Sequence, residues 1–448
     1  MKKGTRIILI TCLIFFYGLM MFIETQGFSP MFCTATRILL LAVYGYLTFR
    51  QKSLTAWILF SMFLGVETGH LFPEISIHLK VISKIFLQLI KTIIAPLIFA
   101  TLVVGIAGHS NLKQVGRMGL KAILYFEVVT TIALFIGLAA INITQAGVGV
   151  IKPENLKEDQ LTVVKQNAEE IILHIFPENI AKSIADGQVL QIVVFSILFA
   201  IGLALVKNEK KRKPMLDFTE SLSEVMFRFT DTVMYFAPFA VFGSIAYTVS
   251  TMGLDVLKVL FLLLITLYGS LVVFLLGVLL PVALIAKVNI RKFMAAIAEP
   301  VSIAFATASS ESALPKALEN MEGFGVPGKI VAFVLPTGYS FNLDGTTLYL
   351  SLASIFVAQV AGIHLSFTEQ LVMVLTLMLT SKGVAGVARA SLVILLGTAA
   401  SFNLPVWPIY MILGIDVLMD MARTSVNVIG NCLACVVIAK WEGEFKNS

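Results

Sequence analysis

The sequence predicts an all-α protein that crosses a membrane many times. Of its 448 residues, 58% are hydrophobic and 13% are charged, and the mean hydropathy is +0.92. A soluble globular protein has about 25% charged residues. Long apolar runs recur along the chain and leave little room for a soluble domain. The net charge of +6 therefore indicates basic cytoplasmic loops and not the folded basic surface of a nucleic-acid-binding protein.

Residues 1–53 hold one or two hydrophobic segments in front of the main body. The first segment follows a basic start and runs to Ile23, without an A-x-A-like cleavage site after it. We interpret it as a retained span, with a cleaved signal peptide as the alternative. A second, weaker segment runs from Arg37 to Phe49. Two crossing segments would form a hairpin with both ends in the cytoplasm, whereas a single anchor with an interfacial second segment is the other interpretation.

Residues 54–292 are expected to contain six spans. Basic residues gather in alternate connections, which places those connections in the cytoplasm. The long acidic connection between Ala146 and Lys182 is expected outside, and the Lys207–Lys213 run is interpreted as a solvated cytoplasmic loop. The expected spans are Trp57–Leu71, Ile82–Ala107, Ala122–Ile143, Val189–Val206, Val225–Val249 and Leu257–Ala286.

Residues 293–448 follow a different pattern, because small and polar clusters interrupt their apolar segments. The clusters lie at 306–315, 336–347, 380–391 and 414–431. Two internal repeats with broken helices produce such an alternation, and a solute site at the membrane midplane lies where the repeats meet. Backbone that leaves a helix at this depth must line a cavity or be buried in protein. The first and third clusters are therefore predicted to be the tips of re-entrant hairpins.

The apolar run from Trp407 to Ile438 carries the first candidate site. Five of its polar residues recur at i, i+3, i+4, i+7 and i+11 and share one helix face: Asp420, Arg423, Thr424, Asn427 and Asn431. Ionisable groups at membrane depth mark substrate or ion paths. Arg423 can hold a carboxylate with two parallel hydrogen bonds, and Asp420 can hold an ammonium group. The pair suits an acidic amino acid, and an internal Asp420–Arg423 ion pair is the alternative.

Two further clusters could contribute to the same site. Asn342-Leu-Asp-Gly345 is predicted to be an unwound turn within a span, where Asn342, Asp344 and freed carbonyls supply the oxygen ligands that a small cation requires. An ordinary Asx turn is the alternative. Ser309 and Ser310, at the first hairpin tip, offer hydroxyls and backbone N–H groups to an anion.

Other chemistries find little support in the sequence. It contains no Walker A sequence, so ATP hydrolysis is not expected to drive the protein, and no H-E-x-x-H or G-x-S-x-G, which makes an enzyme the weaker alternative. The expected partners are a small solute, co-transported cations and membrane lipids, with no cofactor.

Four segments of the chain resemble the dicarboxylate/amino acid:cation symporters, which include the bacterial proton/sodium–glutamate symporters and the excitatory amino acid transporters. These segments are Phe86–Phe99, Thr307–Pro315, Gly338–Gly345 and Gly414–Asn431. The resemblance runs from about residue 54 to 445. It implies a homotrimer in the cell (inner) membrane with eight core spans, two re-entrant hairpins and inverted repeats. Each protomer would combine a scaffold (spans 1, 2, 4 and 5) with an elevator-like transport domain (spans 3 and 6 and residues 293–448).

The resemblance also implies roles for individual residues. Asp420 would hold the substrate ammonium and Arg423 its side-chain carboxylate. The other expected substrate contacts are Ser309, Ser310, Thr346, Gly386, Val387, Thr424 and Asn427. Cations are expected near Thr130, Thr131, Asn342, Asp344, Asn427 and Asn431, and at carbonyls around Ser340, Leu343, Ser381, Lys382 and Val384.

Some positions depart from the family pattern. Asn431 stands where strictly sodium-coupled members carry Asp, which favours proton or mixed coupling. Glu127 stands where some members carry Tyr, and Glu127 and Glu311 are candidate proton carriers. Arg389 replaces a glycine in the second hairpin tip. The resulting hypothesis is secondary active uptake of L-glutamate or L-aspartate with Na⁺ and/or H⁺. A C4-dicarboxylate symporter and a passive anion channel are the alternatives.

Overall fold

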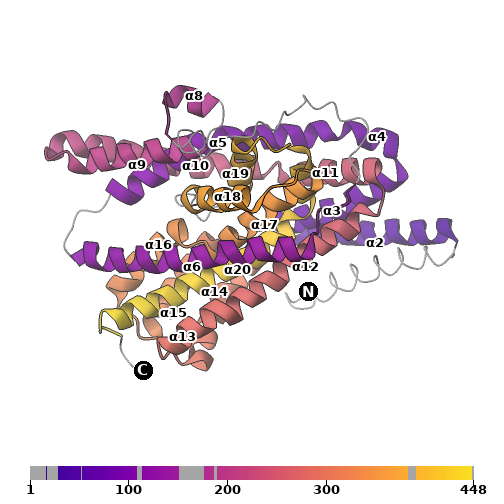
Figure 1. Cartoon of the computed structure of the whole chain (residues 1–448). Coiled ribbons are helices and arrows are strands. Elements are labelled where there is room, and N and C mark those ends of the chain that lie inside the picture. Colours follow the sequence, from indigo (N-terminus) through magenta and orange to yellow (C-terminus); the bar gives the residue numbers. More distant parts are fainter. Residues whose placement is uncertain are drawn as a thin grey trace. The chain divides into compact units, whose positions relative to one another are not determined.

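All secondary structure in the described part of the chain is helical. The computed structural model describes Tyr17 and residues 29–51, 53–107, 114–150, 176–185, 189–381 and 390–445. Within these ranges, seven helices are long and apolar enough to cross a membrane, or eight if α10 and α11, separated by a short break, count as one span. The prediction of an all-α, polytopic architecture is therefore confirmed (Figure 1).

The chain divides into two compact units, and the first consists of residues 1–86 and 235–254. In this unit α11 packs closely against α3. A Cβ on Gly69 would lie 2.6 Å from the carbonyl oxygen of Ala246, so small residues permit the close approach of the two backbones. The helices of unit 1 are α2 (Pro30–Gln51), α3 (Leu54–Leu71), α4 (Pro73–His78), the start of α5 (Lys80–Ala107) and α11 (Ala237–Met252).

A buried ion pair links α2 to α3 within unit 1. Arg37 Nε lies 2.6 Å from Glu67 Oε1, with both side chains buried. Tyr17, a helical and buried residue, donates its hydroxyl to the same oxygen at 2.8 Å. Because unpaired charges are costly in such surroundings, this contact ties residues of the predicted N-terminal extension to the first span of the main body. The choice between a retained and a cleaved first segment rests on residues outside the described ranges.

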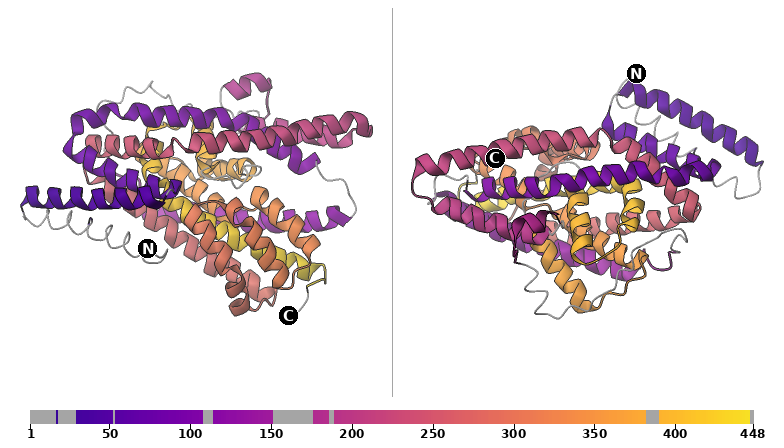
Figure 2. Two further views of the ribbon diagram at one scale, coloured as in Figure 1. Left: turned by 180° about the vertical axis from the view of Figure 1, so that it is seen from behind. Right: turned by 90° about the horizontal axis from the view of Figure 1, so that it is seen from above.

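Unit 2 consists of residues 87–234 and 255–448 and is organised around its last helix. This helix, α20, is buried along nearly its whole length and contacts α12, α14, α15, α16 and α17 (Figures 1 and 2). Besides the end of α5, unit 2 contains α6 (Gln114–Thr144), α8 (Ile180–Ala185), α9 (Val189–Leu205), α10 (Glu209–Met234), α12 (Val256–Phe274), the π-helix η1 (Leu275–Leu279), α13 (Leu280–Ile285), α14 (Ile290–Thr307), α15 (Ser310–Gly323), α16 (Gly328–Phe341), α17 (Asp344–Val360), α18 (Phe367–Thr380), α19 (Ala390–Ser401) and α20 (Trp407–Trp441).

Two sequence-based expectations need correction. The single span expected at Val225–Val249 is two helices, α10 and α11, interrupted at Tyr235–Phe236. Pro238 stands in the first turn of α11, where its missing N–H is tolerated, and it cannot continue a preceding helix. The Lys207–Lys213 run is not a loop throughout, because α10 begins at Glu209 and includes its last four basic residues.

The alternation predicted for residues 293–448 is visible as two pairs of short helices, each followed by a long element. Helices α14 and α15 form the first pair and α18 and α19 the second. The first pair precedes the interrupted helix α16–α17, and the second precedes α20. The assignment of these elements to a scaffold and a moving domain stays a prediction.

Candidate functional site

The chain leaves its helical path between α16 and α17, as the sequence predicts. Helix α16 ends at Phe341, Asn342 and Leu343 adopt non-helical backbone angles, and α17 begins at Asp344. The interruption is narrower than expected, because Asp344 and Gly345 already belong to the first turn of α17. Asn342 and Asp344 are completely buried. An interrupted helix in the interior frees backbone groups that other parts of the protein, or a ligand, must satisfy.

Asn427 of α20 satisfies part of that interruption. Its side-chain oxygen accepts hydrogen bonds from the backbone N–H groups of Gly345 and Thr346, at 2.8 and 3.2 Å. Its amide nitrogen donates to Thr346 Oγ1 at 2.9 Å. Asn427 therefore acts as a helix cap supplied by another helix, a role that its position in the sequence does not indicate.

Three side chains with oxygen atoms meet beside this cap. The amide nitrogen of Asn342 lies 3.3 Å from Asp344 Oδ2 and 3.2 Å from Asn431 Oδ1. Glycines make the approach feasible, because a Cβ on Gly430 would overlap Asp344 Oδ2 and one on Gly338 would overlap Asn431 Oδ1. In the described part of the chain, nothing donates to Asn342 Oδ1. This donor set of carboxylate and amide oxygens suits a small hard cation.

Arg423 lies between two carboxylates of its own helix. Its Nε is 2.9 Å from Asp420 Oδ1, and its Nη1 is 3.1 Å from Asp416 Oδ1. Thr424 also donates to Asp420 Oδ1, at 3.2 Å. The internal Asp420–Arg423 pair, which the sequence left as an alternative, is present. All four side chains are buried.

Two partners of Arg423 were missed by sequence reasoning. Asp416 lies two turns before Arg423, a spacing that places both on the same helix face and could have revealed the pair. The ring of Tyr349, from α17, lies under the guanidinium with 4.1 Å between its centroid and Cζ. No signal in the sequence predicts this contact, because it joins residues of two helices far apart in the chain.

Several charged side chains are buried in unit 2. Among its described residues these are the carboxylates Asp344, Asp416 and Asp420 and the guanidinium Arg423. Burial of charged groups is costly unless each one is compensated. Such a cluster is stabilised by additional positive charge, whether a proton, a metal ion or the ammonium group of a solute.

The first hairpin tip is formed as predicted. Helix α14 ends at Ala308 in the left-handed conformation, with φ 50°, and Ser309 caps α15 by accepting a hydrogen bond from the N–H of Ser312. Ser310 is buried. Both arms of the hairpin contact α20, but among the described residues no hydrogen bond joins the two serines to Arg423 or its carboxylates. The side chain of Glu311 lies outside what the structure describes.

The second hairpin tip lies outside the described residues. This segment, 382–389, carries four expected site residues as well as Arg389: Lys382, Val384, Gly386 and Val387. The arms on either side of it, α18 and α19, are in contact. Ser381, at the end of α18, is buried. The side chain of Ser340 is likewise outside the described part.

The expected cation residues of α6 lie on a helix that packs directly on α17. Thr130 is buried and donates its hydroxyl to the carbonyl oxygen of Phe126 at 2.7 Å. Thr131 and Glu127 are partly buried. Ser351 of α17 donates to the carbonyl oxygen of Leu134 at 2.8 Å, which fixes the register of the two helices.

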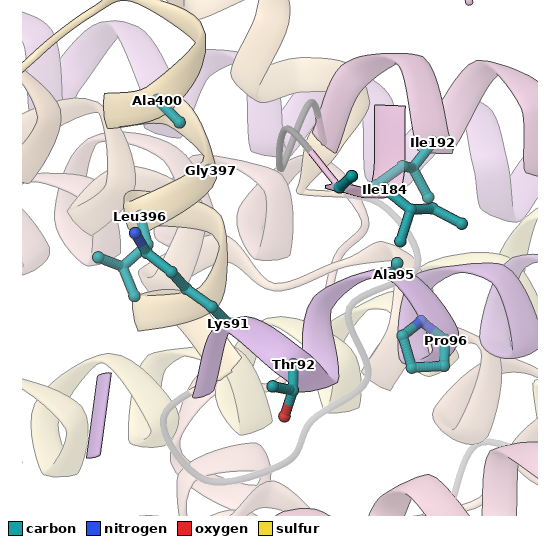
Figure 3. Close-up of a pocket in the computed structure, with 10 residues that line it drawn as sticks. Lys91, Thr92, Ala95, Pro96, Ile184, Ile192, Leu396, Gly397 and Ala400 are labelled. Carbon is teal, nitrogen blue, oxygen red and sulfur yellow. The ribbon is translucent and has the colours of Figure 1, made fainter. Parts of the chain in front are cut away.

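A cavity of about 320 Å³ lies between α5, α8, α9 and α19, away from these polar side chains. The side chain of Lys91 of α5 extends toward Leu396 of α19 (Figure 3). Its described lining is mainly aliphatic, with Lys91 as the charged residue among the ten. These described residues do not offer the paired charges that an amino acid requires, so the polar face of α20 remains the candidate solute site.

Comparisons with known proteins agree with this architecture. The family model described as the sodium:dicarboxylate symporter family matches residues 54–441. The proton/sodium-glutamate symport protein of Geobacillus stearothermophilus is 43% identical over 401 residues, covering 87% of this chain and 95% of the relative. The proton/glutamate-aspartate symporter of Escherichia coli is 43% identical over 408 residues, covering 87% and 93%. The C4-dicarboxylate transport protein of Bacillus subtilis is 38% identical over 401 residues, covering 88% and 94%.

The family match and the helices agree on the class of protein. With at least seven helices of spanning length, the chain is a multi-pass membrane protein. The match begins at the first residue of α3 and ends with α20, so α2 and Arg37 precede it. This protein belongs to the sodium:dicarboxylate symporter family.

Proposed function

We propose that this protein takes up acidic amino acids together with cations, as a secondary active symporter. The observation that supports it most directly is the position of Arg423 between Asp416 and Asp420. If Asp420 turns to a substrate ammonium, Asp416 still balances the guanidinium. A buried arginine paired with a single carboxylate would be left uncompensated if that carboxylate turned away, and the free-energy cost would be larger.

In this proposal Arg423 binds the side-chain carboxylate of the substrate. Its Nη2 has no hydrogen-bond partner within the described ranges and remains available for one arm of a bidentate contact. The ring of Tyr349 keeps the guanidinium plane oriented. Thr424, Thr346 and Asn427 contribute the nearby polar groups, and the two hairpin tips, with Ser309, Ser310, Gly386 and Val387, close over the solute.

The coupled cation is proposed to bind next to the solute. Asn342 already lies within hydrogen-bonding distance of both Asp344 and Asn431, and of the three only Asp344 carries charge. Thr130 and Thr131 and the carbonyls near Ser340, Leu343, Ser381, Lys382 and Val384 would complete the coordination. A substrate ammonium and one cation would both bring positive charge to these buried carboxylates. Glu127 and Glu311 remain candidate proton carriers.

A C4-dicarboxylate is the second candidate substrate, since relatives with that printed function are 38–40% identical to this chain. Such a solute has no ammonium group and gains nothing from Asp420. Replacing Asp420 by Asn should therefore weaken glutamate and aspartate uptake at least tenfold and leave succinate uptake nearly unchanged. Equal losses for all three solutes would contradict the ammonium role.

The direct test is uptake of labelled glutamate, aspartate and succinate in proteoliposomes, with sodium and proton gradients imposed separately. We expect accumulation above the outside concentration, driven by a proton or a mixed gradient. Asn431→Asp should increase the dependence on sodium, because a carboxylate replaces an amide among the cation ligands. Equilibration without accumulation would identify a passive pore and overturn the proposal.

We also propose that the working protein is a homotrimer that moves its substrate by an elevator motion. The support is family membership alone, and the measurement is the mass of the detergent-solubilised particle by light scattering. A mass equal to one chain or two chains would contradict the trimer.

A further inference from the structure

A large apolar cavity opens where α6, α13 and α20 meet in unit 2. It measures about 630 Å³, and each helix contributes aliphatic side chains to it, such as Leu124, Val282 and Val437. Several of these are exposed in the described structure, Ile285 to 82% and Leu124 to 56%. At one end of the cavity the lining changes to Lys287, Lys440 and Trp441.

A second, smaller hollow adjoins the first and shares both lysines with it. It measures about 110 Å³, and Lys292 adds a third ammonium group to its lining. It also contains Asn289, which caps the N-terminus of α14. No acidic residue lines either hollow in the part of the chain described here. The apolar cavity and the small basic hollow therefore lie side by side at their shared lysines.

The two shared lysines are held in position. Lys440 donates to the carbonyl oxygen of Lys287 at 2.9 Å, and its Nζ lies 4.9 Å from the ring centroid of Phe445. Lys287 adopts a left-handed conformation, with φ 51°, at the end of α13. Within the described residues, neither lysine has a carboxylate at ion-pair distance. Their charge is available to a ligand.

Neighbouring lysines at the same end of unit 2 are already paired. Lys121 lies 2.6 Å from Glu442, and Lys329 lies 2.8 Å from Glu444. Lys287 and Lys440 differ from these two lysines because they have no carboxylate at ion-pair distance among the described residues. Lys329 is a matched control, since it lies at the same end of unit 2 but is ion-paired.

We propose that these adjoining hollows bind an anionic phospholipid, a role distinct from solute transport. An acyl chain would occupy the apolar cavity, and the phosphate would contact Lys287, Lys440 and Lys292. Basic residues gather in cytoplasmic connections, and the cytoplasmic leaflet carries the anionic lipids. Trp441, half-exposed at the mouth, suits the level of the lipid headgroups. A free phosphate would not require the apolar cavity, which is why a lipid is the better match.

Native mass spectrometry of the delipidated full-length protein tests this proposal. With phosphatidylglycerol as the probe, we expect specific binding, and much weaker binding of phosphatidylcholine. Each lysine near an anionic headgroup contributes about fivefold in affinity, so Lys287→Gln with Lys440→Gln should lower phosphatidylglycerol affinity roughly 25-fold. Lys329→Gln should change it by less than about twofold. Equal affinity for both lipids, or equal loss in the control, would overturn the proposal.

A second variant tests the acyl-chain cavity with all the lysines intact. Val128→Trp would fill space between α6 and α13 and should also reduce phosphatidylglycerol binding. Unchanged lipid binding in this variant, with full displacement of the lipid by inorganic phosphate, would indicate an anion site and contradict a lipid site. A change in oligomeric state on filling the cavity would point to a contact with a second copy and would likewise refute the lipid assignment.

Discussion

Two arginines are fully buried among the described residues, and they differ in the carboxylates that pair with them there. Arg37 in unit 1 pairs with Glu67, which also accepts a hydrogen bond from the hydroxyl of Tyr17. Arg423 in unit 2 pairs with two, Asp416 and Asp420. The guanidinium of Arg423 thus has a second carboxylate beside it in the described structure. We infer that one of the two carboxylates can turn to a cationic group of a solute while the other keeps the guanidinium compensated.

The two clusters also differ in their relation to the family match. Arg423 and its partners lie within residues 54–441, whereas Arg37 precedes them and Glu67 lies inside. A residue of the N-terminal extension thus neutralises an acid in the first span of the family core. We infer that the first cluster holds the extension in place and that the second handles the solute.

The strongest test of this contrast is removal of the unit 2 guanidinium. Arg423→Ala leaves Asp416 and Asp420 without their counter-charge and removes the proposed carboxylate contact. Breaking a buried pair typically costs about 3–5 kcal/mol, which corresponds to more than a hundredfold loss. We expect glutamate and aspartate uptake in proteoliposomes to fall to background.

Gel filtration should show that Arg423→Ala retains the oligomeric state of the unchanged protein, so that the loss reports on binding. Uptake that remains within tenfold of normal would mean that Arg423 does not bind the substrate.

In unit 1 the corresponding change should affect stability. Arg37→Leu leaves Glu67 buried without its partner and should destabilise the packing of α2 on α3 by about 3–5 kcal/mol. The double variant Arg37→Leu with Glu67→Leu removes both charges and should recover most of this loss. Thermal unfolding of the purified protein, with uptake measured in parallel, checks both expectations.

In unit 2 the corresponding double variant, Arg423→Leu with Asp420→Leu, is not expected to recover transport and should show no uptake of glutamate or aspartate. If the double variant in unit 1 were as unstable as Arg37→Leu alone, or lost transport while remaining folded, the assignment of a purely structural role to this pair would be wrong.

The architecture was largely predictable from the sequence because hydrophobicity determines it. Apolar length located the spans, and the small polar clusters located both the first hairpin tip and the interruption near Asn342. The break at Tyr235–Phe236 was not predicted, because the residues from Val233 to Val249 are mainly apolar on both sides of it and only Pro238 marks the boundary. Apolar length and the spacing of polar clusters can be read from the sequence without knowing how the helices pack.

The site was predicted less completely, for a physical reason. Helix periodicity places Asp420, Arg423 and Asn427 on one face, but it does not reveal which groups on other helices face them. The contact of Tyr349 with Arg423 and the capping of α17 by Asn427 arise from the packing of α17 on α20. The ion pair between Arg37 and Glu67 was missed for the same reason.

A smaller effect is expected from replacing Gly430, the glycine that leaves room for the Asp344 carboxylate at the proposed cation site. In Gly430→Ala the new methyl group would overlap Asp344 Oδ2 and displace the carboxylate. We expect the cation concentration for half-maximal uptake to rise about tenfold, because changes in the residues that position metal ligands typically weaken metal binding by a factor of about 10–100. Gly269→Ala is the matched control, since a Cβ there meets nothing within 4 Å. Similar values for both variants would argue against a cation at Asp344.

The smallest expected effect separates the ring of Tyr349 from its hydroxyl. The hydroxyl lies 3.5 Å from Asp416 Oδ1, at the limit of a hydrogen bond, whereas the ring stacks closely on Arg423. Tyr349→Phe keeps the ring and should change the substrate concentration for half-maximal uptake by less than about twofold, while Tyr349→Leu loses a cation–π contact of about 0.5–2 kcal/mol and should raise it roughly two- to thirtyfold. In unit 1 the hydroxyl is the important group, because Tyr17 donates to Glu67 at 2.8 Å. A larger effect from Tyr349→Phe than from Tyr349→Leu would mean that the hydroxyl of Tyr349 matters more than its ring, as proposed for Tyr17. The Arg423 cluster would then be a fixed hydrogen-bonded structure like the Arg37 cluster.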